Sequence, residues 1–375
     1  MTMRSEGLMS GRAPSPQAGP PGGQSAGAFA RQPDPPARRP AARGRSRGAR
    51  GDGMAYAAID LGTNNCRLLV AEPLSARPGG QRFRVIDAFS RIVRLGEGLQ
   101  QNGVLSQPAM DRAIRALGIC ARKVSQYNIA GQQAVATEAC RRAANCEEFL
   151  DRARAETGLD LTIIDVQEEA ALAVTGCCEL LDRNVPYAVI FDIGGGSTEV
   201  IWIAVPTEPG AEPHILATLS VPTGVVTLAE TFGGDRITDG VFEEMVGAVA
   251  DALEPFERQN GIGRHIGDDA VQMIGTSGTV TTLAGLRLGL RRYDRRRVDG
   301  TYLAFTDARA VTGRLLELDY AGRAAQPCIG QDRADLVVAG CAILEAICRS
   351  WPVGNLRVAD RGLREGILHR LMPAA

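Results

Sequence analysis

One short pattern occurs twice in the chain, and it restricts the fold more than any other feature of the sequence. In each copy an apolar run leads into an aspartate, an apolar residue, a glycine and three small residues, and a second apolar run follows. The copies align Asp60 with Asp192 and Arg67 with Glu199. Each copy predicts a β-hairpin around a polar loop. Because the internal spacing is identical, we predict two duplicated α/β domains that face one another across a cleft.

The rest of the chain alternates predicted helices and strands. Some segments have apolar residues at helical spacing, and short apolar runs separate them. The predicted helices are Ala109–Tyr127, Cys146–Glu156, Glu168–Leu181, Val280–Leu290, Ala334–Arg349 and Leu363–Leu371. The predicted strands are Tyr56–Ile59, Leu68–Ala71, Thr162–Val166, Ala188–Phe191, Glu199–Val205, Val271–Ile274 and Leu356–Val358. The fold class is therefore α/β.

The first 53 residues differ in composition from the rest. They are rich in Pro, Gly, Ala, Ser and Arg, and nine Arg against three acids give them a formal charge of +6. Without an apolar period, residues 1–53 predict a disordered basic tail. The tail can bind nucleic acid or anionic lipid weakly, but a plain solvated tail is the simpler interpretation, and Met54 is an alternative start. Since the whole chain has a formal charge of -1, the remainder is near -7 and does not predict a nucleic-acid surface.

The remaining bulk properties predict a cytoplasmic protein. No apolar run approaches the roughly 18 residues of a membrane span, and the N-terminus lacks an apolar secretion segment. The nine cysteines are scattered without zinc-ligand spacing, so we expect reduced thiols. Lys123 is the only lysine, which excludes any mechanism that needs a P-loop or Schiff-base lysine elsewhere in the chain.

Three loops of small polar residues on strand ends predict phosphate binding. Glycine lets the backbone approach an oxyanion closely, and short hydroxyls and amides add hydrogen-bond donors. The third loop, Gly275–Thr279, also leads into a helix, whose N-terminal N–H groups favour an anion. Any single loop is more often an ordinary turn, but three of them favour a phosphate site. The phosphate-binding candidates from these loops are Gly62, Thr63, Asn64, Gly194, Gly195, Gly196, Ser197, Thr198, Thr276, Ser277 and Gly278.

Carboxylates beside these loops predict a divalent cation. Asp60 and Asp192 end their strands where phosphate would repel them unless a cation lies between, which suggests Mg²⁺ held by both. The alternative is that each aspartate caps its own turn. Glu199 is a lone carboxylate in an otherwise apolar strand. Glu168 and Glu169 open a helix, and on composition alone they are acids that favour the helix dipole.

Covalent phosphatase chemistry is not indicated. Cys146 and Cys177 each precede an arginine at the spacing of cysteine phosphatases, but the intervening residues are acidic, leucine-containing and helical. Three scattered histidines also offer no Ser-His-Asp arrangement.

Five motifs resemble one known family. They are AIDLGTNNCRLLV from Ala58, ATEACRRAANCEEF from Ala136, IFDIGGGSTEV from Ile190, IGTSGTVTTLAG from Ile274 and VADRGLREGIL from Val358. Their order and content resemble the exopolyphosphatase and guanosine pentaphosphate phosphohydrolase (Ppx/GppA) family, within the actin, Hsp70 and sugar-kinase superfamily. The resemblance covers residues 54–372.

The resemblance implies two ribonuclease H-like, actin-like ATPase domains at residues 54–183 and 184–375, with the C-terminal helix returning to the domain junction. It implies Mg²⁺-dependent removal of terminal phosphate from polyphosphate or guanosine pentaphosphate (pppGpp), the latter linked to the stringent response. Glu169 matches the catalytic glutamate that activates water, so the resemblance outweighs the dipole interpretation. Asp192 and Glu199 match acidic site residues, and Arg141 a phosphate-binding arginine. Thr63, Asn64, Arg67 and residues 195–198 match the family's phosphate loops.

Two features depart from the family pattern, and two alternative functions remain open. Ala171 replaces an arginine usual in the family, and the extra C-terminal helical domains of long members do not follow the last helix, which favours short polyphosphate or a nucleotide. One alternative is a small-molecule kinase of the same superfamily, although no acceptor subsite is evident. The other is a non-catalytic sensor that closes on pppGpp. A homodimer is a further expectation.

Overall fold

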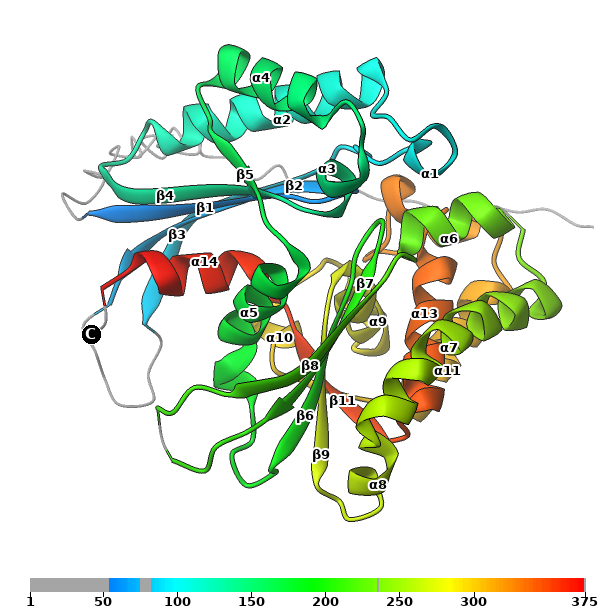
Figure 1. The fold of residues 1–375 in the computed structure, drawn as a ribbon. Coiled ribbons are helices and arrows are strands. Elements are labelled where there is room, and N and C mark those ends of the chain that lie inside the picture. The colour runs from blue at the N-terminus through cyan, green and yellow to red at the C-terminus, as the bar shows by residue number, and fades with distance from the viewer. Residues whose placement is uncertain (1–53, 75–81, 209, 235, 374–375) are drawn as a thin grey trace, which may run out of the picture. The chain divides into compact units, whose positions relative to one another are not determined.

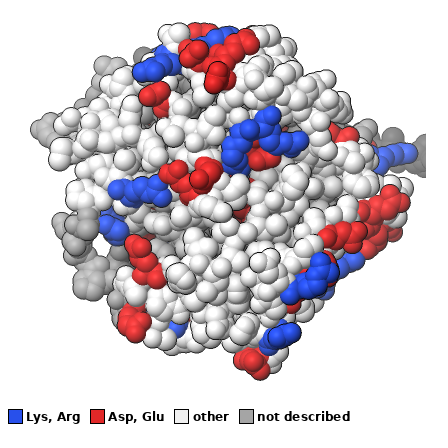
Figure 2. Space-filling view, in the orientation of Figure 1, with Lys and Arg blue, Asp and Glu red and all other residues white. Residues whose placement is uncertain are grey.

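The structure is a computed structural model that describes residues 54–74, 82–208, 210–234 and 236–373. The predicted basic tail, residues 1–53, lies outside the described residues. Within them, no helix combines the length and apolar character needed to cross a membrane. Acidic and basic side chains lie in mixed groups on the face shown in Figure 2.

The first sheet has five strands in the order β3-β2-β1-β4-β5. Strands β1 to β3 are antiparallel neighbours, whereas β4 runs parallel to β1 and β5 parallel to β4. The bounds are β1 Ala55–Leu61, β2 Asn65–Pro73, β3 Phe83–Ile92, β4 Ile129–Ala136 and β5 Leu161–Ile163. Helices α2 (Gln107–Val124) and α4 (Cys146–Thr157) cover one face (Figure 1).

The second sheet has six strands in the order β10-β11-β9-β6-β7-β8. The bounds are β6 Tyr187–Ile193, β7 Thr198–Ala204, β8 His214–Val221, β9 Val271–Thr276, β10 Tyr302–Ala304 and β11 Asn355–Ala359. Four helices pack into a core on one face of it: α7 Asp239–Asn260, α9 Gly278–Arg287, α11 Phe305–Leu316 and α13 Val337–Ser350. The short elements are α1 Leu99–Asn102, α3 Glu138–Arg142, α6 Val225–Phe232, α8 Ile262–Ile266, α10 Arg295–Val298, α12 Tyr320–Ala324, η1 Cys178–Leu180 and η2 Gln331–Arg333.

The two hairpins repeat in three dimensions as they do in the sequence. Asp60 lies opposite Arg67 in the β1–β2 ladder, and Asp192 lies opposite Glu199 in the β6–β7 ladder. Each turn closes with the same backbone hydrogen bond, from the glycine two residues after the aspartate to the carbonyl three residues further on, at 2.9 Å in both. The predicted α/β fold class, with the duplicated hairpin in each of two sheets, is confirmed.

Two helices lie between the sheets and cross from one half of the duplication to the other. Helix α5 (Val166–Cys177) follows β5 of the first sheet but packs on β7 and β8 of the second. Helix α14 (Leu363–Leu371) follows β11 of the second sheet but packs on β1 of the first. The two helices also pack on each other (Figure 1). Helix α5 comes before residue 184 in the chain, but it contacts the second sheet. The domain boundary between residues 183 and 184 therefore stays a prediction.

Glycines set the close approach of α5 and α14, which gives a stability prediction. A Cβ on Gly366 would lie 2.0 Å from the carbonyl oxygen of Leu172, a backbone atom that cannot rotate away. Gly366→Ala is therefore expected to lower the free energy of unfolding by about 2 kcal/mol or more, as overpacking does. Chemical denaturation measures it. The control is Gly313→Ala in α11, where a Cβ meets no atom within 4 Å, and this variant should be neutral or more stable. Equal stability of the two variants would contradict this role of Gly366.

Several predicted boundaries were wrong for local reasons. The predicted strand Thr162–Val166 ends at Ile163, because Asp165 caps α5 by accepting a hydrogen bond from the Glu168 N–H at 2.8 Å. Helix α5 then ends at Cys177 and continues as the 3-10 turn η1 rather than reaching Leu181. Helix α9 starts two residues early because Ser277 caps it. Strands β3, β4, β8 and β10 were not predicted, and the charged or polar residues that interrupt β3 and β4 explain two of these omissions.

Candidate active site

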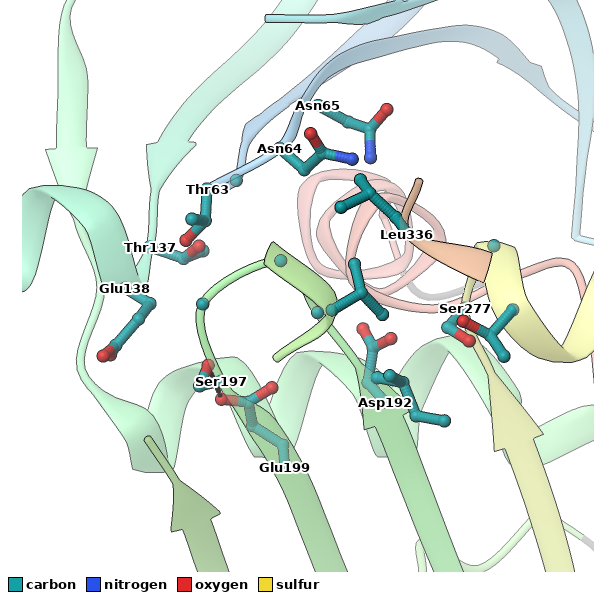
Figure 3. A pocket seen from close by; sticks show the side chains of 18 of the residues that line it. Thr63, Asn64, Asn65, Thr137, Glu138, Asp192, Ser197, Glu199, Ser277 and Leu336 are labelled. Carbon is teal, nitrogen blue, oxygen red and sulfur yellow. Dashed lines mark hydrogen bonds between the residues drawn. The ribbon is translucent and has the colours of Figure 1, made fainter. Parts of the chain in front are cut away.

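The two hairpin loops meet face to face. A Cβ on Gly195 would lie 2.9 Å from the Cβ of Asn64, and one on Gly196 would lie 2.8 Å from the Thr63 hydroxyl. Glycine is therefore required at both positions for the loops to touch. The loop after β9, with Ser277 and Gly278, faces the same space, so all three predicted phosphate loops converge on one cavity (Figure 3).

Most of the predicted site residues line this cavity. Those that do are Asp60, Gly62, Thr63, Asn64, Arg67, Glu169, Asp192, Gly194, Gly195, Gly196, Ser197, Glu199, Ser277 and Gly278. Thr276 lines an adjoining cavity, and its hydroxyl donates a hydrogen bond to the carbonyl of Arg361 at 3.0 Å. Both cavities are bordered by Asp60, Arg67 and Asp192, so they share a wall at the strand ends.

Two predicted phosphate ligands line neither cavity. Thr198 is fully buried, and its hydroxyl donates to the Thr223 carbonyl at 2.7 Å, so it stabilises the hairpin. Arg141 lies behind Glu169: its Nη1 donates to Glu169 Oε2 at 2.7 Å and to the Ile164 carbonyl at 2.9 Å. Arg141 also pairs with Glu138 at 3.2 Å. In this arrangement Arg141 positions a carboxylate rather than facing the cavity.

Glu169 lies in the first turn of α5, where that helix points at the loops. The pKa of its carboxyl is raised to about 7: burial is the main cause, Arg141 opposes it, and the nearby Asp192 and Asp60 add to it. A carboxylate with a pKa near neutrality, fixed by an arginine at a cavity wall, is suited to accept a proton from a bound molecule.

Asp60 and Asp192 end equivalent strands and face the same cavity. Burial and the proximity of Asp60 raise the pKa of Asp192 to about 6, while Arg67 and Arg364 oppose the shift. Burial likewise raises the pKa of Asp60. Among the described residues, no group of three or more His, Cys, Asp or Glu side chains surrounds one metal position. Two crowded carboxylates without a third ligand fit Mg²⁺, which commonly takes one or two carboxylates and completes its shell with phosphate and water.

Glu199 is buried beside the second loop. Its Oε1 accepts hydrogen bonds from the hydroxyls of Ser197 at 2.5 Å and Ser220 at 3.1 Å. Burial and the neighbouring Glu169 hold the pKa of Glu199 well above its usual range. Glu199 therefore fixes the Ser197 side chain of the loop, and its carboxyl group adds to those of Asp60, Asp192 and Glu169 on the cavity wall.

Comparison with known proteins identifies the family. A model of the Ppx/GppA phosphatase family matches residues 75–375. The chain belongs to the Ppx/GppA phosphatase family. It is 30% identical over 325 residues to a Haemophilus influenzae protein provisionally assigned as an exopolyphosphatase, covering 86% of this chain and 93% of that protein.

Solved structures of the family share the fold. The Aquifex aeolicus Ppx/GppA family member has a TM-score of 0.68 and 27% identity, covering 84% of this chain and 96% of its own. An exopolyphosphatase from Cytophaga hutchinsonii has a TM-score of 0.74 and 25% identity, covering 85% of this chain and 97% of its own. The resemblance inferred from the five sequence motifs is confirmed, and the chain is a phosphatase by family.

Three arginines of this Ppx/GppA chain face the cavities without a partner. Arg67 and Arg333 line both cavities, and Arg364 lines the adjoining one. In the part of the chain that the structure describes, their side chains make no hydrogen bond or ion pair. Burial lowers the pKa of Arg333 and of Arg364. The three residues are half-buried, and their guanidinium groups bring positive charge to the cavity walls, where they can pair with an anion.

Sequence reasoning predicted Arg67 but not the other two. Arg364 lies within the motif from Val358, two residues after Gly362 in the loop that follows β11. Its place in this motif could have pointed to it as a site residue. Arg333 lies in the short turn η2 before α13 and carries no local pattern. Asn65, Thr137 and Glu138 were also missed on the cavity wall. The side-chain oxygen of Asn65, like that of Asn64, is buried and has no hydrogen-bond partner among the residues that the structure describes.

Proposed function

We propose that this chain is a hydrolase that removes the terminal phosphate of inorganic polyphosphate, with Mg²⁺ as cofactor. The observation that carries the proposal is the convergence of three phosphate-type loops, three unpaired arginines and Glu169 on adjoining cavities. The exopolyphosphatase assignments of two relatives support polyphosphate as the substrate.

The residues divide into those that hold phosphate and those that move a proton. Backbone N–H groups of the loops hold the transferred phosphoryl group, and Arg67, Arg333 and Arg364 pair with the following phosphates. Glu169 takes a proton from the water whose oxygen attacks the terminal phosphorus, while the bond from phosphorus to the bridging oxygen breaks. Asp60 and Asp192 would hold Mg²⁺, which when bound neutralises phosphate charge.

Guanosine pentaphosphate is the second candidate substrate. The adjoining cavity carries the ring of Tyr293 together with Pro327 and Ile329, which offer an apolar surface beside the phosphate site. A nucleoside attached to a phosphate chain can lie against such a surface.

A side-by-side assay tests the proposal. Phosphate release is measured from tripolyphosphate, long-chain polyphosphate and pppGpp, with Mg²⁺ and with EDTA. Release from polyphosphate only with Mg²⁺ supports the proposal, and a higher kcat/KM for pppGpp would favour the second candidate. Tight binding without release from any of them would favour a sensor, and phosphate transfer from ATP to a small acceptor would favour a kinase.

Arg141 gives a pH prediction. A base must be ionised, so kcat/KM should rise with pH through about 7, the pKa of Glu169. Because the Arg141 charge lowers that pKa, Arg141→Gln should move the rising limb to higher pH. The control is Arg142→Gln, since Arg142 pairs with Glu138 at 3.7 Å and not with Glu169. An unshifted limb in the Arg141 variant would exclude Glu169 as the titrating group.

A further inference from the structure

The segment that leads from α9 into α10 carries an unusual concentration of arginine. Its sequence, RRYDRRR from Arg291 to Arg297, holds five arginines and one acid. Four of the five guanidinium groups, those of Arg291, Arg292, Arg296 and Arg297, belong to exposed residues. Within the described part of the chain, these four side chains make no ion pair or hydrogen bond. We call these four residues the arginine rim.

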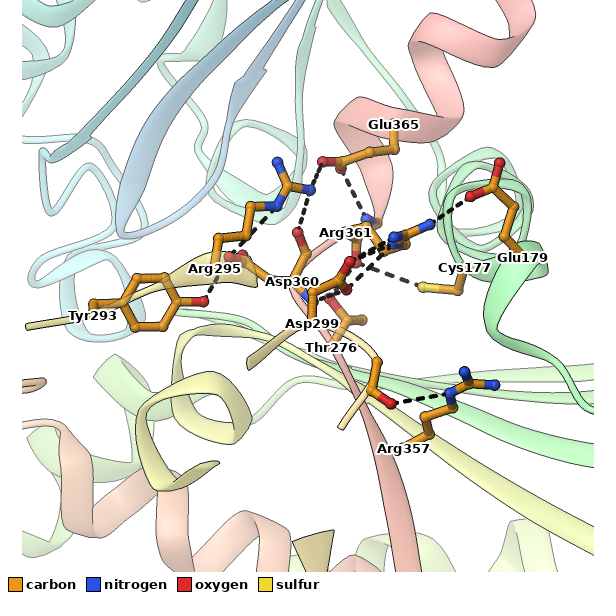
Figure 4. Close-up of polar contacts among 12 residues, drawn as sticks. Cys177, Glu179, Thr276, Tyr293, Arg295, Asp299, Arg357, Asp360, Arg361 and Glu365 are labelled. Atoms are coloured by element: carbon orange, nitrogen blue, oxygen red, sulfur yellow. Dashed lines mark hydrogen bonds and ion pairs between the residues drawn. The ribbon is translucent and has the colours of Figure 1, made fainter. Parts of the chain in front are cut away.

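The rim is anchored to the protein at regular points. Leu290 and Val298 are buried at its two ends. Between them the Tyr293 hydroxyl donates to Asp360 Oδ2 at 2.6 Å, and Arg295 Nη2 donates to Glu365 Oε1 at 2.7 Å (Figure 4). The inward side chains are thus fixed, and the four rim arginines are left on the outside.

The one acid in the segment is already engaged. Asp294 caps α10 by accepting a hydrogen bond from the backbone N–H of Arg296 at 3.0 Å. Its carboxylate serves the helix start and pairs with no arginine of the rim. The rim therefore keeps most of its positive charge, which favours a polyanion as its ligand.

The anchors connect the rim to the phosphate site. Tyr293 and Arg295 line the adjoining cavity, which also contains Arg364 and shares Arg67 and Arg333 with the cavity of Glu169. A phosphate chain whose end lies at Glu169 can pass Arg67, Arg333 and Arg364 and leave the protein beside the segment that bears the rim.

We propose that the arginine rim is an extended binding site for the distal part of long polyphosphate chains. This inference rests on the proposed function and adds a chain-length preference to it. The rim would favour long polymers, which is opposite to the short-substrate expectation of the sequence analysis.

The test neutralises the rim in one variant, Arg291→Gln, Arg292→Gln, Arg296→Gln and Arg297→Gln. At about twofold for each exposed ionic contact, KM for long-chain polyphosphate should rise roughly tenfold, while kcat/KM for tripolyphosphate stays unchanged. The salt dependence should also weaken: the slope of log(kcat/KM) against log salt should fall by up to about 3, at roughly 0.7 for each lost contact with a single-stranded polyanion.

A matched control removes the same charge elsewhere. Four other exposed arginines line neither cavity and have no ion pair among the described residues: Arg115, Arg122, Arg264 and Arg314. Their replacement by glutamine should leave both substrates unaffected. Equal losses in the two variants, or equal losses for short and long substrates, would overturn the proposal.

Binding measurements separate this proposal from the proposed function. If the wild-type protein hydrolyses neither tripolyphosphate nor long chains, the proposed function fails. Binding of end-labelled long-chain polyphosphate in EDTA, where no turnover interferes, then still compares wild type with the rim variant. Unchanged polyphosphate binding in the rim variant, or loss of single-stranded RNA binding alone, would overturn the rim as a polyphosphate site.

Discussion

Glu169→Gln is expected to reduce phosphate release about a hundred- to ten-thousandfold, the range of a lost general base. Glutamine keeps the size and the hydrogen-bonding oxygen that Arg141 contacts at 2.7 Å, but it cannot accept a proton from water. Polyphosphate affinity should stay within a few-fold of wild type, because the loops and the unpaired arginines hold the chain. Single-turnover release and equilibrium binding measure the two quantities separately.

Glu168→Gln is the matched control. Glu168 precedes Glu169 in the same helical turn, but it lines neither cavity and pairs with Arg370 at 2.7 Å. We expect nearly normal turnover in this variant. Turnover unchanged by Glu169→Gln, or an equal loss in both variants, would remove Glu169 from the mechanism.

The loops and the aspartates of the site could be predicted because short contiguous stretches of sequence encode them. A hairpin fixes its own register, so the match of Asp60 to Asp192 in the sequence became the same ladder position in both sheets. Strand ends and helix starts also place short loops at one edge, which is why Ser277 faces the same cavity as Gly195. For Glu169, composition favoured the helix dipole, and only the resemblance supplied a role.

The positions of the other site residues depend on contacts between distant segments, which local sequence patterns do not encode. Arg333 reaches the cavity because its side chain lies beside Gly278 at the start of α9, far away in the sequence. Arg141 was expected to face phosphate, but its guanidinium, from α3, donates instead to Glu169 in the first turn of α5. Thr198 belongs to a loop motif and still points away, since the chain at Thr223 offers it an acceptor.

Asp192→Asn is expected to lower the activity of the protein and, without metal, to raise its stability. Metal ions supply several kcal/mol of transition-state stabilisation, so weakening a Mg²⁺ ligand should lower kcat/KM roughly a hundredfold or more. Burial raises the pKa of Asp192 from 3.8 to about 6 in the folded state. The folded state therefore favours the protonated carboxyl, and the free energy of unfolding falls as the pH rises from about 4 through about 6. At neutral pH without metal, the asparagine variant should therefore have a higher Tm than wild type.

Mg²⁺ binding and a control substitution at Asp299 test whether Asp192 is a metal ligand. Added Mg²⁺ should raise the Tm of wild type through binding to the folded state, and it should raise that of Asp192→Asn much less. Asp299 is the contrast, because both its oxygens accept hydrogen bonds from Arg361 and it lines neither cavity. Asp299→Asn should lower the Tm with or without Mg²⁺, as loss of a paired carboxylate does. If Asp192→Asn behaved in the same way, Asp192 would be a structural residue and the cation would have to lie elsewhere.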